Sequence, residues 1–192
     1  MSNINLESME LYTERLVLKV LDSSFAPQVL DYFIRNKVFF KEWNPAVGEE
    51  FYTLAFQQDK LQLELDLTRQ ERMLRLWLFK KEDASFVRVI GDLAFSNIVR
   101  GAFQSCHLGY KIDEAASNQG FITEALRTAI SFAFDELKLH RIEANIMPRN
   151  QRSRRVVTKL GFVEEGLAKK YLKINGVWED HLHYVLLNPA LE

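Results

Sequence analysis

Two short segments hold residue types that bind anions where helices begin. The first is residues 115–120 (AASNQG), between a strand-like and a helical segment, and the second opens with Asn150 and Ser153. The first turn of a helix leaves backbone N–H groups without partners, and the helix dipole favours negative charge there. Small residues let these groups approach a phosphate, and Gly120 permits close approach or a positive φ. Together the segments predict a site for a phosphate-bearing small molecule, although residues 115–120 alone are more simply a capped connection.

Asn150 and Ser153 could also take part in chemistry. Asn is a good N-cap, and Pro148 disfavours helix at the residue before it. Residues three apart share one side of a helix, so Asn150 could hold an amide while Ser153 donates a proton to a leaving thiolate. The simpler interpretation of Ser153 is a capping or solvent-facing hydroxyl. Cations oppose the dipole at a helix start, so either a bound anion or a solvated basic face explains the arginines here: Arg149, Arg152, Arg154 and Arg155.

Apolar periodicity predicts one domain over residues 1–192, with a core from about 13 to 187. Strands are expected at 15–21, 74–78, 86–98, 104–112, 142–146 and on both sides of Asn175-Gly176, a favoured hairpin turn. Helices are expected near 27–34, 49–68, 121–137 and 150–160, and an aromatic-rich loop at 39–45. Gly91 indicates a bulge or a close approach of backbones. This order predicts a mixed sheet with helices on both faces.

Composition excludes several classes of protein. The 192 residues are 47% hydrophobic and 27% charged with a net charge of -1, so neither a nucleic acid nor a membrane is expected as a direct partner. No apolar run approaches the roughly 20 residues of a membrane span, and the N-terminal segment lacks a signal-peptide pattern, so the expected location is the cytoplasm. Cys106 is the single cysteine and no histidine pair has ligand spacing, so no metal is expected.

An ordered set of motifs resembles the GNAT superfamily of acyl-CoA-dependent N-acetyltransferases. Within it the chain most resembles the ribosomal-protein N-terminal (alanine or serine) acetyltransferases. The resemblance implies an α/β (α+β) acyl-CoA N-acyltransferase fold, with a mixed, mostly antiparallel seven-stranded sheet and helices on both faces. The motifs are TERLVL (13–18), IGD (90–92), LGY (108–110), HRIEANIMPRNQRS (140–153), KLGFVEEG (159–166) and NGVWEDH (175–181).

The resemblance also implies a position for acetyl-CoA, the expected co-substrate. It would lie in a V-shaped opening between the strand ending at Ile112 and the strand spanning residues 142–147. The backbone of Tyr110, Lys111 and Ile112 would bind the pantetheine arm together with Asn150, and Ser153 would protonate the departing thiolate. Only the central glycine of the family's usual phosphate loop is present in the segment that would hold the pyrophosphate: Ser117, Asn118, Gln119, Gly120, Phe121, Ile122 and Thr123.

The general base stays open, because residues 171–174 lack the carboxylate that some relatives carry before the final hairpin. His107 is the first candidate, since it would flank the acetyl group and an imidazole can accept a proton near neutral pH. Glu143 and Asp92 are also candidates, although ion pairs on the sheet explain them more simply. His181 and His183 are expected to be surface or packing residues.

The expected acceptor-binding residues are Phe40, Trp43 and Asp92, with core packing an equal alternative for the aromatic pair. Transfer would be direct, since Cys106 has no evident activating neighbour in sequence and is more simply a buried, inert thiol. The resemblance favours the N-terminal α-amine of a ribosomal or other protein as acceptor. A small-molecule amine (polyamine, amino acid or aminoglycoside-like) is the first alternative. A non-catalytic acyl-CoA-binding module is the second, and a homodimer stays open.

Overall fold

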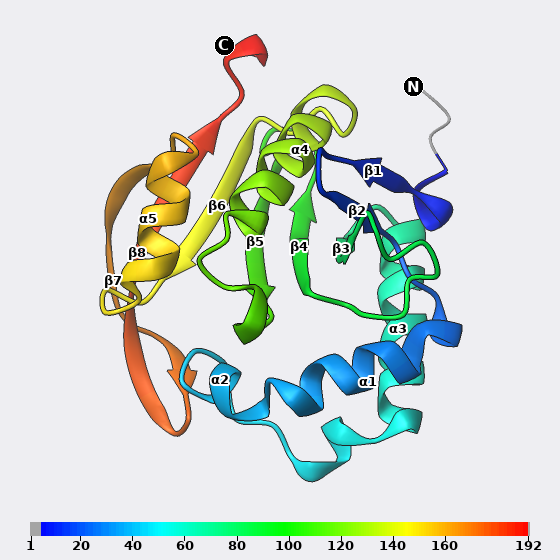
Figure 1. Ribbon diagram of the computed structural model, residues 1–192. Helices are drawn as coiled ribbons and strands as arrows, with labels where there is room; N and C mark the ends of the chain where they lie inside the picture. Colours follow the sequence, from blue (N-terminus) through cyan, green and yellow to red (C-terminus); the bar gives the residue numbers. More distant parts are fainter. Residues whose placement is uncertain (1–4, 192) are drawn as a thin grey trace.

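The computed structural model describes residues 5–191, which contain one eight-stranded sheet in the order β1-β2-β3-β4-β5-β6-β8-β7 (Figure 1). Neighbouring strands are antiparallel except for β5 and β6, which run parallel. The strands are β1 (Glu10–Tyr12), β2 (Leu16–Lys19), β3 (Leu74–Lys80), β4 (Gly91–Val99), β5 (Ser105–Ile112), β6 (Arg141–Ile146), β7 (Val163–Ile174) and β8 (Val177–Leu187).

Helices cover both faces of this sheet because large apolar side chains alternate along its central strands. In β3, Leu76 belongs to a core that also contains Leu126 of α4 (Phe121–Asp135), whereas Trp77 belongs to a second core with Tyr32 of α1 (Ala26–Arg35) and Leu61 of α3 (Leu54–Arg69). No helix within residues 5–191 has the length and apolar character needed to cross a bilayer. The helices are α1 (Ala26–Arg35), α2 (Lys37–Lys41), α3 (Leu54–Arg69), α4 (Phe121–Asp135) and α5 (Gln151–Lys159).

The mixed sheet with helices on both faces is confirmed, but the sheet has eight strands and not seven. The additional strand is β1, whose Glu10 pairs with Lys19 of β2. Three residues are too few to show an alternating pattern, so nothing in the sequence marks this strand. The single-domain prediction covers residues 1–192, of which 1–4 and 192 lie outside the described residues.

Three other boundaries differ from the sequence prediction. The aromatic segment at 39–45 is not all loop, because α2 extends to Lys41. Strand β4 starts at Gly91 and not at Phe86, which lies before the strand and has a φ of 52°, in the left-handed region. The helix expected from Glu49 is a 3-10 turn (Glu49–Tyr52) followed by α3, which is capped by the Thr53 side chain.

Strands β5 and β6 separate partway along their length, as Figure 1 shows. Their parallel pairing runs from Ser105–Arg141 to His107–Glu143, yet β5 continues to Ile112 and β6 to Ile146. Backbone polar groups on the facing edges beyond this point have no partner strand, so they are free to bind another molecule. The predicted V-shaped opening is therefore present in the fold.

Candidate active site

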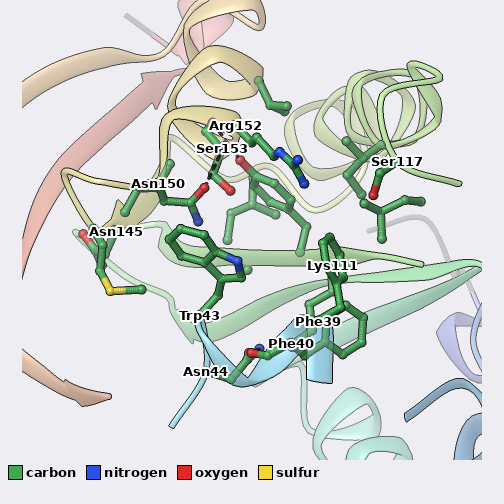
Figure 2. Close-up of a pocket in the computed structure, with 18 of the residues that line it drawn as sticks. Phe39, Phe40, Trp43, Asn44, Lys111, Ser117, Asn145, Asn150, Arg152 and Ser153 are labelled. Carbon is green, nitrogen blue, oxygen red and sulfur yellow. Dashed lines mark hydrogen bonds between the residues drawn. The ribbon is translucent and has the colours of Figure 1, made fainter. Parts of the chain in front are cut away.

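A cavity of about 290 Å³ lies where β5 and β6 separate. In Figure 2, Asn150, Ser153 and Arg152 at the start of α5 face Trp43, Phe40 and Lys111 across it. Ser117, from the loop before α4, lies at one end. The predicted site residues that line the cavity are Phe40, Trp43, Tyr110, Lys111, Ile112, Ser117, Ile122, Asn150 and Ser153.

The start of α5 is fixed to the cavity by two hydrogen bonds. Asn150 is the N-cap, and its Oδ1 accepts a hydrogen bond from the Ser153 backbone N–H at 3.1 Å. From β5, the Tyr110 hydroxyl donates to the Ser153 carbonyl oxygen, also at 3.1 Å. Burial raises the pKa of Tyr110 well above its ordinary value, so this phenol remains a donor at neutral pH. Ser153 is thereby held at the cavity from both its backbone N–H and its carbonyl.

The arginines around α5 have different roles. Arg149 pairs with Glu42 at 2.8 Å and Glu179 at 3.0 Å, and Arg154 donates to the Tyr184 hydroxyl at 3.1 Å. Arg152 lines the cavity, and among residues 5–191 its side chain has no hydrogen bond or ion pair. Arg152 is therefore the arginine of this lining that is available to bind an anion. The sequence shows only a cluster of arginines and could not tell Arg152 from the paired ones.

The predicted phosphate loop only partly reaches the cavity. Ser117 and Ile122 line it, and Gly120 has the positive φ expected of it, 81°. Gly120 is also the N-cap residue of α4 and offers no side-chain cap, so the first N–H groups of this helix are free of side-chain capping. Phe121 is only 7% exposed and packs in the core beneath the Arg15 guanidinium. The predicted residues of this loop that do not line the cavity are Asn118, Gln119, Gly120, Phe121 and Thr123.

The structure does not bring His107 or Asp92 to the cavity. His107 occupies the last paired position before the strands separate, opposite Glu143, and its Nδ1 lies 3.2 Å from the Asn97 side-chain amide. Asp92 is 1% exposed, accepts a hydrogen bond from the Tyr32 hydroxyl and pairs with Arg75. Burial opposes ionisation of Asp92, but Lys111 and Arg75 outweigh it and lower the pKa of this carboxyl.

A different histidine, His181 of β8, lines the cavity. Its Nδ1 lies 3.1 Å from the Glu179 carbonyl oxygen. Because a carbonyl can only accept, Nδ1 carries the proton in this contact and the neutral ring keeps its lone pair on Nε2. The Tyr171 ring packs against the His181 ring with centroids 5.3 Å apart, and the Tyr171 hydroxyl accepts from the Asn145 amide at 3.2 Å.

His181 was expected to be a surface or packing residue. In the sequence, the spacing of His181 and His183 indicates only that the two side chains lie on the same face of a strand. Which face meets the cavity depends on β8 lying between β6 and β7. No local pattern in one sequence encodes that order of strands.

Known proteins match both the sequence and this fold. Residues 15–163 match the family model described as Acetyltransferase (GNAT) domain. The [Ribosomal protein uS5]-alanine N-acetyltransferase of Escherichia coli (strain K12) is 36% identical over 96% of this chain and 94% of its own length. The structure of ribosomal-protein-S5-alanine acetyltransferase from Vibrio fischeri has a TM-score of 0.90 and 32% identity, covering 96% of this chain and all of that one.

Mycobacterium smegmatis RimJ in complex with CoA-disulfide has a TM-score of 0.85 and 27% identity over 92% of this chain and 83% of its own. The family model spans most of the chain, and the curated relative matches it along nearly its whole length. The chain therefore belongs to the GNAT acetyltransferase family and is an N-acetyltransferase.

Proposed function

We propose that this enzyme transfers the acetyl group of acetyl-CoA to the N-terminal α-amine of a protein, with a ribosomal protein as the favoured acceptor. The observation that carries the proposal is the cavity between the separated strands β5 and β6, bounded by the start of α5. The similar Mycobacterium smegmatis protein was solved with a CoA disulfide, and the similar Escherichia coli enzyme is named for an alanine of ribosomal protein uS5.

The residues at this site fit acetyl-CoA. The open edge of β5 at Tyr110, Lys111 and Ile112 offers backbone donors and acceptors to a pantetheine amide chain. Two features can bind the negatively charged phosphates: the start of α4, which has no side-chain cap, and the unpaired side chain of Arg152. When bound, acetyl-CoA supplies the acetyl thioester. This fit supports the predicted cofactor segment from Ser117 to Thr123, whose contribution would come chiefly from backbone N–H groups.

Two side chains of the cavity can move the protons of the reaction. The amine nitrogen forms a bond to the acetyl carbon while the carbon–sulfur bond breaks. His181 Nε2 takes the proton that the amine loses, and the Ser153 hydroxyl gives one to the departing sulfur; exchange with water then resets both groups. We assign the base to His181 in place of His107 because only His181 lines the cavity and its Nδ1 contact leaves Nε2 as the acceptor.

The test is acetylation of synthetic peptides, followed by thiol release and by mass spectrometry of the product. Peptides with a free N-terminal Ala or Ser should be acetylated at the α-amine, whereas the same peptides blocked at the N-terminus should not react. Exclusive acetylation of polyamines, amino acids or an aminoglycoside would overturn the protein acceptor. Binding of acetyl-CoA without turnover on any amine would indicate a binding module.

Within the same assay, Ser153→Ala should lower kcat by about a hundredfold or more while acetyl-CoA affinity changes little, because the variant removes only the proton donor. Thr158→Ala removes a hydroxyl from an exposed position near the other end of α5 and serves as the matched control. Unchanged kcat in Ser153→Ala would remove this serine from the mechanism.

A further inference from the structure

A second cavity, of about 430 Å³, adjoins the first. Phe40, Asn44 and Lys111 line both cavities. The remaining walls of the second cavity come from α1, α2 and the segment after it, the turn at Glu49–Tyr52, α3, β3 and Asn175 at the tip of the β7–β8 hairpin. The Asn175 amide donates a hydrogen bond to the Lys41 carbonyl, which joins the hairpin tip to the end of α2. A chain leaving the first cavity on the acceptor side could therefore continue into the second.

The side chains that line the second cavity are mainly cationic. They include one carboxylate, Glu49, and five basic residues: Lys37, Lys41, Lys60, Arg75 and Lys111. Three carboxylates balance part of this charge. Lys37 pairs with Glu49 at 2.9 Å, Lys60 with Glu64 at 2.7 Å, and Arg75 with both Glu64 and Asp92.

Two of the cations have no such partner. Among the described residues, neither Lys41 nor Lys111 has a side-chain hydrogen bond or an ion pair within 4.0 Å, and the nearby Asp92 is already paired with Arg75. An added negative charge would therefore face two ammonium groups without a direct ion pair, of which Lys111 also acts at longer range on Asp92. The aromatic rings of Phe33 and Phe51, whose centroids lie 4.8 Å apart, offer apolar contact to the stem that carries such a charge.

Apart from Lys111, which lines both cavities, the cations of the second cavity are not positioned for the phosphates of acetyl-CoA. The candidate phosphate segment contributes Ser117 and Ile122 to the first cavity and no residue to the second. The unpaired Arg152 likewise lines only the first cavity. Of the residues assigned to the cofactor, Lys111 lines the second cavity, and its assigned role is a backbone contact to the pantetheine arm that leaves its side chain free.

We propose that the second cavity binds an acidic side chain of the acceptor polypeptide, located a few residues after the amine that is acetylated. This inference rests on the proposed function and specifies its substrate class: an N-terminal segment with a carboxylate near its start. An extended chain advances about 3.3 Å per residue, so a cavity next to the reacting centre is within reach of the residues that follow the first.

The experiment compares peptides that share an N-terminal Ala and differ at one later position, which carries Glu, Gln or Lys in turn. At the position that reaches the cavity, Gln should raise KM by about three- to tenfold over Glu with kcat unchanged, as expected for a partly screened ion pair. Lys should raise KM further, because it adds a like charge.

Charge reversal in the enzyme provides the matching half of the test. Lys41 is exposed, so Lys41→Glu should fold and bind acetyl-CoA as the unmodified enzyme does. This variant should lose the preference for Glu and favour the Lys peptide. Lys169→Glu places the same substitution on an exposed site of β7 away from both cavities and should keep the original preference.

The outcomes separate this inference from the function on which it rests. Equal kcat/KM for the Glu, Gln and Lys peptides at every position, with acetylation proceeding, would overturn the acidic subsite and leave the proposed function standing. A preference that Lys41→Glu and Lys169→Glu alter to the same degree would also overturn it. Failure to acetylate any peptide would overturn both.

Discussion

The two histidines considered as the base differ in what surrounds their rings. His181 has one nitrogen occupied by the Glu179 carbonyl and lies at the cavity, whereas His107 contacts Asn97 at the paired end of the strands. A general base must reach the proton that it removes, so position is the first criterion. Sequence reasoning selected His107 from its neighbours along the chain, because the cross-strand position of His181 cannot be deduced from local pattern.

Replacing each histidine by Gln tests this assignment. His181→Gln should lower kcat/KM by about a hundredfold, because the variant lacks the ring nitrogen that accepts the proton of the amine. His107→Gln should retain the rate, which makes it the matched control. The measurement is kcat/KM of the three proteins with the same peptide. A loss of rate in His107→Gln alone would restore the original assignment.

Cys106 is the residue that a covalent route through an acyl-cysteine would require. The side chain is 1% exposed, and burial raises the pKa of its thiol to about 12, so almost no thiolate exists at neutral pH. We expect no labelling of the native protein by iodoacetamide at pH 8 and complete labelling after unfolding. Rapid labelling that acetyl-CoA suppresses would instead indicate a reactive thiol in the site.

At the scale of elements, short-range patterns were predictable and pairings between distant segments were not. The Asn150 cap and the positive φ of Gly120 follow from rules that act over a few residues, and both are present. Strand β1 has only three residues, so its place is fixed by pairing with β2 and not by its own pattern. The second cavity was likewise beyond prediction, because its cations come from α2, α3, β3 and β5, which are far apart in the chain.

Gly91 shows how one backbone contact positions two strands. A Cβ at Gly91 would lie 2.8 Å from the Lys111 carbonyl oxygen and 3.1 Å from Ile112 Cδ1, so the predicted close approach is present. We expect Gly91→Ala to lower the free energy of unfolding by about 1–3 kcal/mol, as strained overpacking does. Gly109→Ala is the matched control for stability, since nothing lies within 4 Å of its added Cβ. Equal denaturant midpoints for the two variants would contradict this account.

At the scale of the whole molecule, an ionic layer lies between the sheet and α3. Glu64 accepts from Lys60 at 2.7 Å and lies 2.8 Å from Arg75, which also pairs with Asp92. Charged groups taken out of water lose hydration that their pairing only partly replaces. The layer therefore adds little net stability. The charged form of one member, Lys60, is disfavoured, because burial and the neighbouring Arg75 lower its pKa to about 8.

This shift gives stability a defined dependence on pH. The ordinary Lys pKa is 10.5, so between pH 8 and 10.5 the unfolded chain binds a proton at Lys60 that the folded protein does not. Where the unfolded state binds more protons, stability rises with pH. The side chain introduced by Lys60→Met cannot titrate, so this variant should be more stable than the unmodified protein at pH 7. Its advantage in free energy of unfolding should shrink by up to about 3 kcal/mol as the pH rises from 8 to 10.5.

Gln58→Met, at an exposed site of α3, introduces the same side chain without removing a titrating group. Urea unfolding of all three proteins at pH 7, 8, 9 and 10 should therefore give a constant difference for Gln58→Met and a falling one for Lys60→Met. A constant difference for both variants would show that the burial of Lys60 does not disfavour its charge.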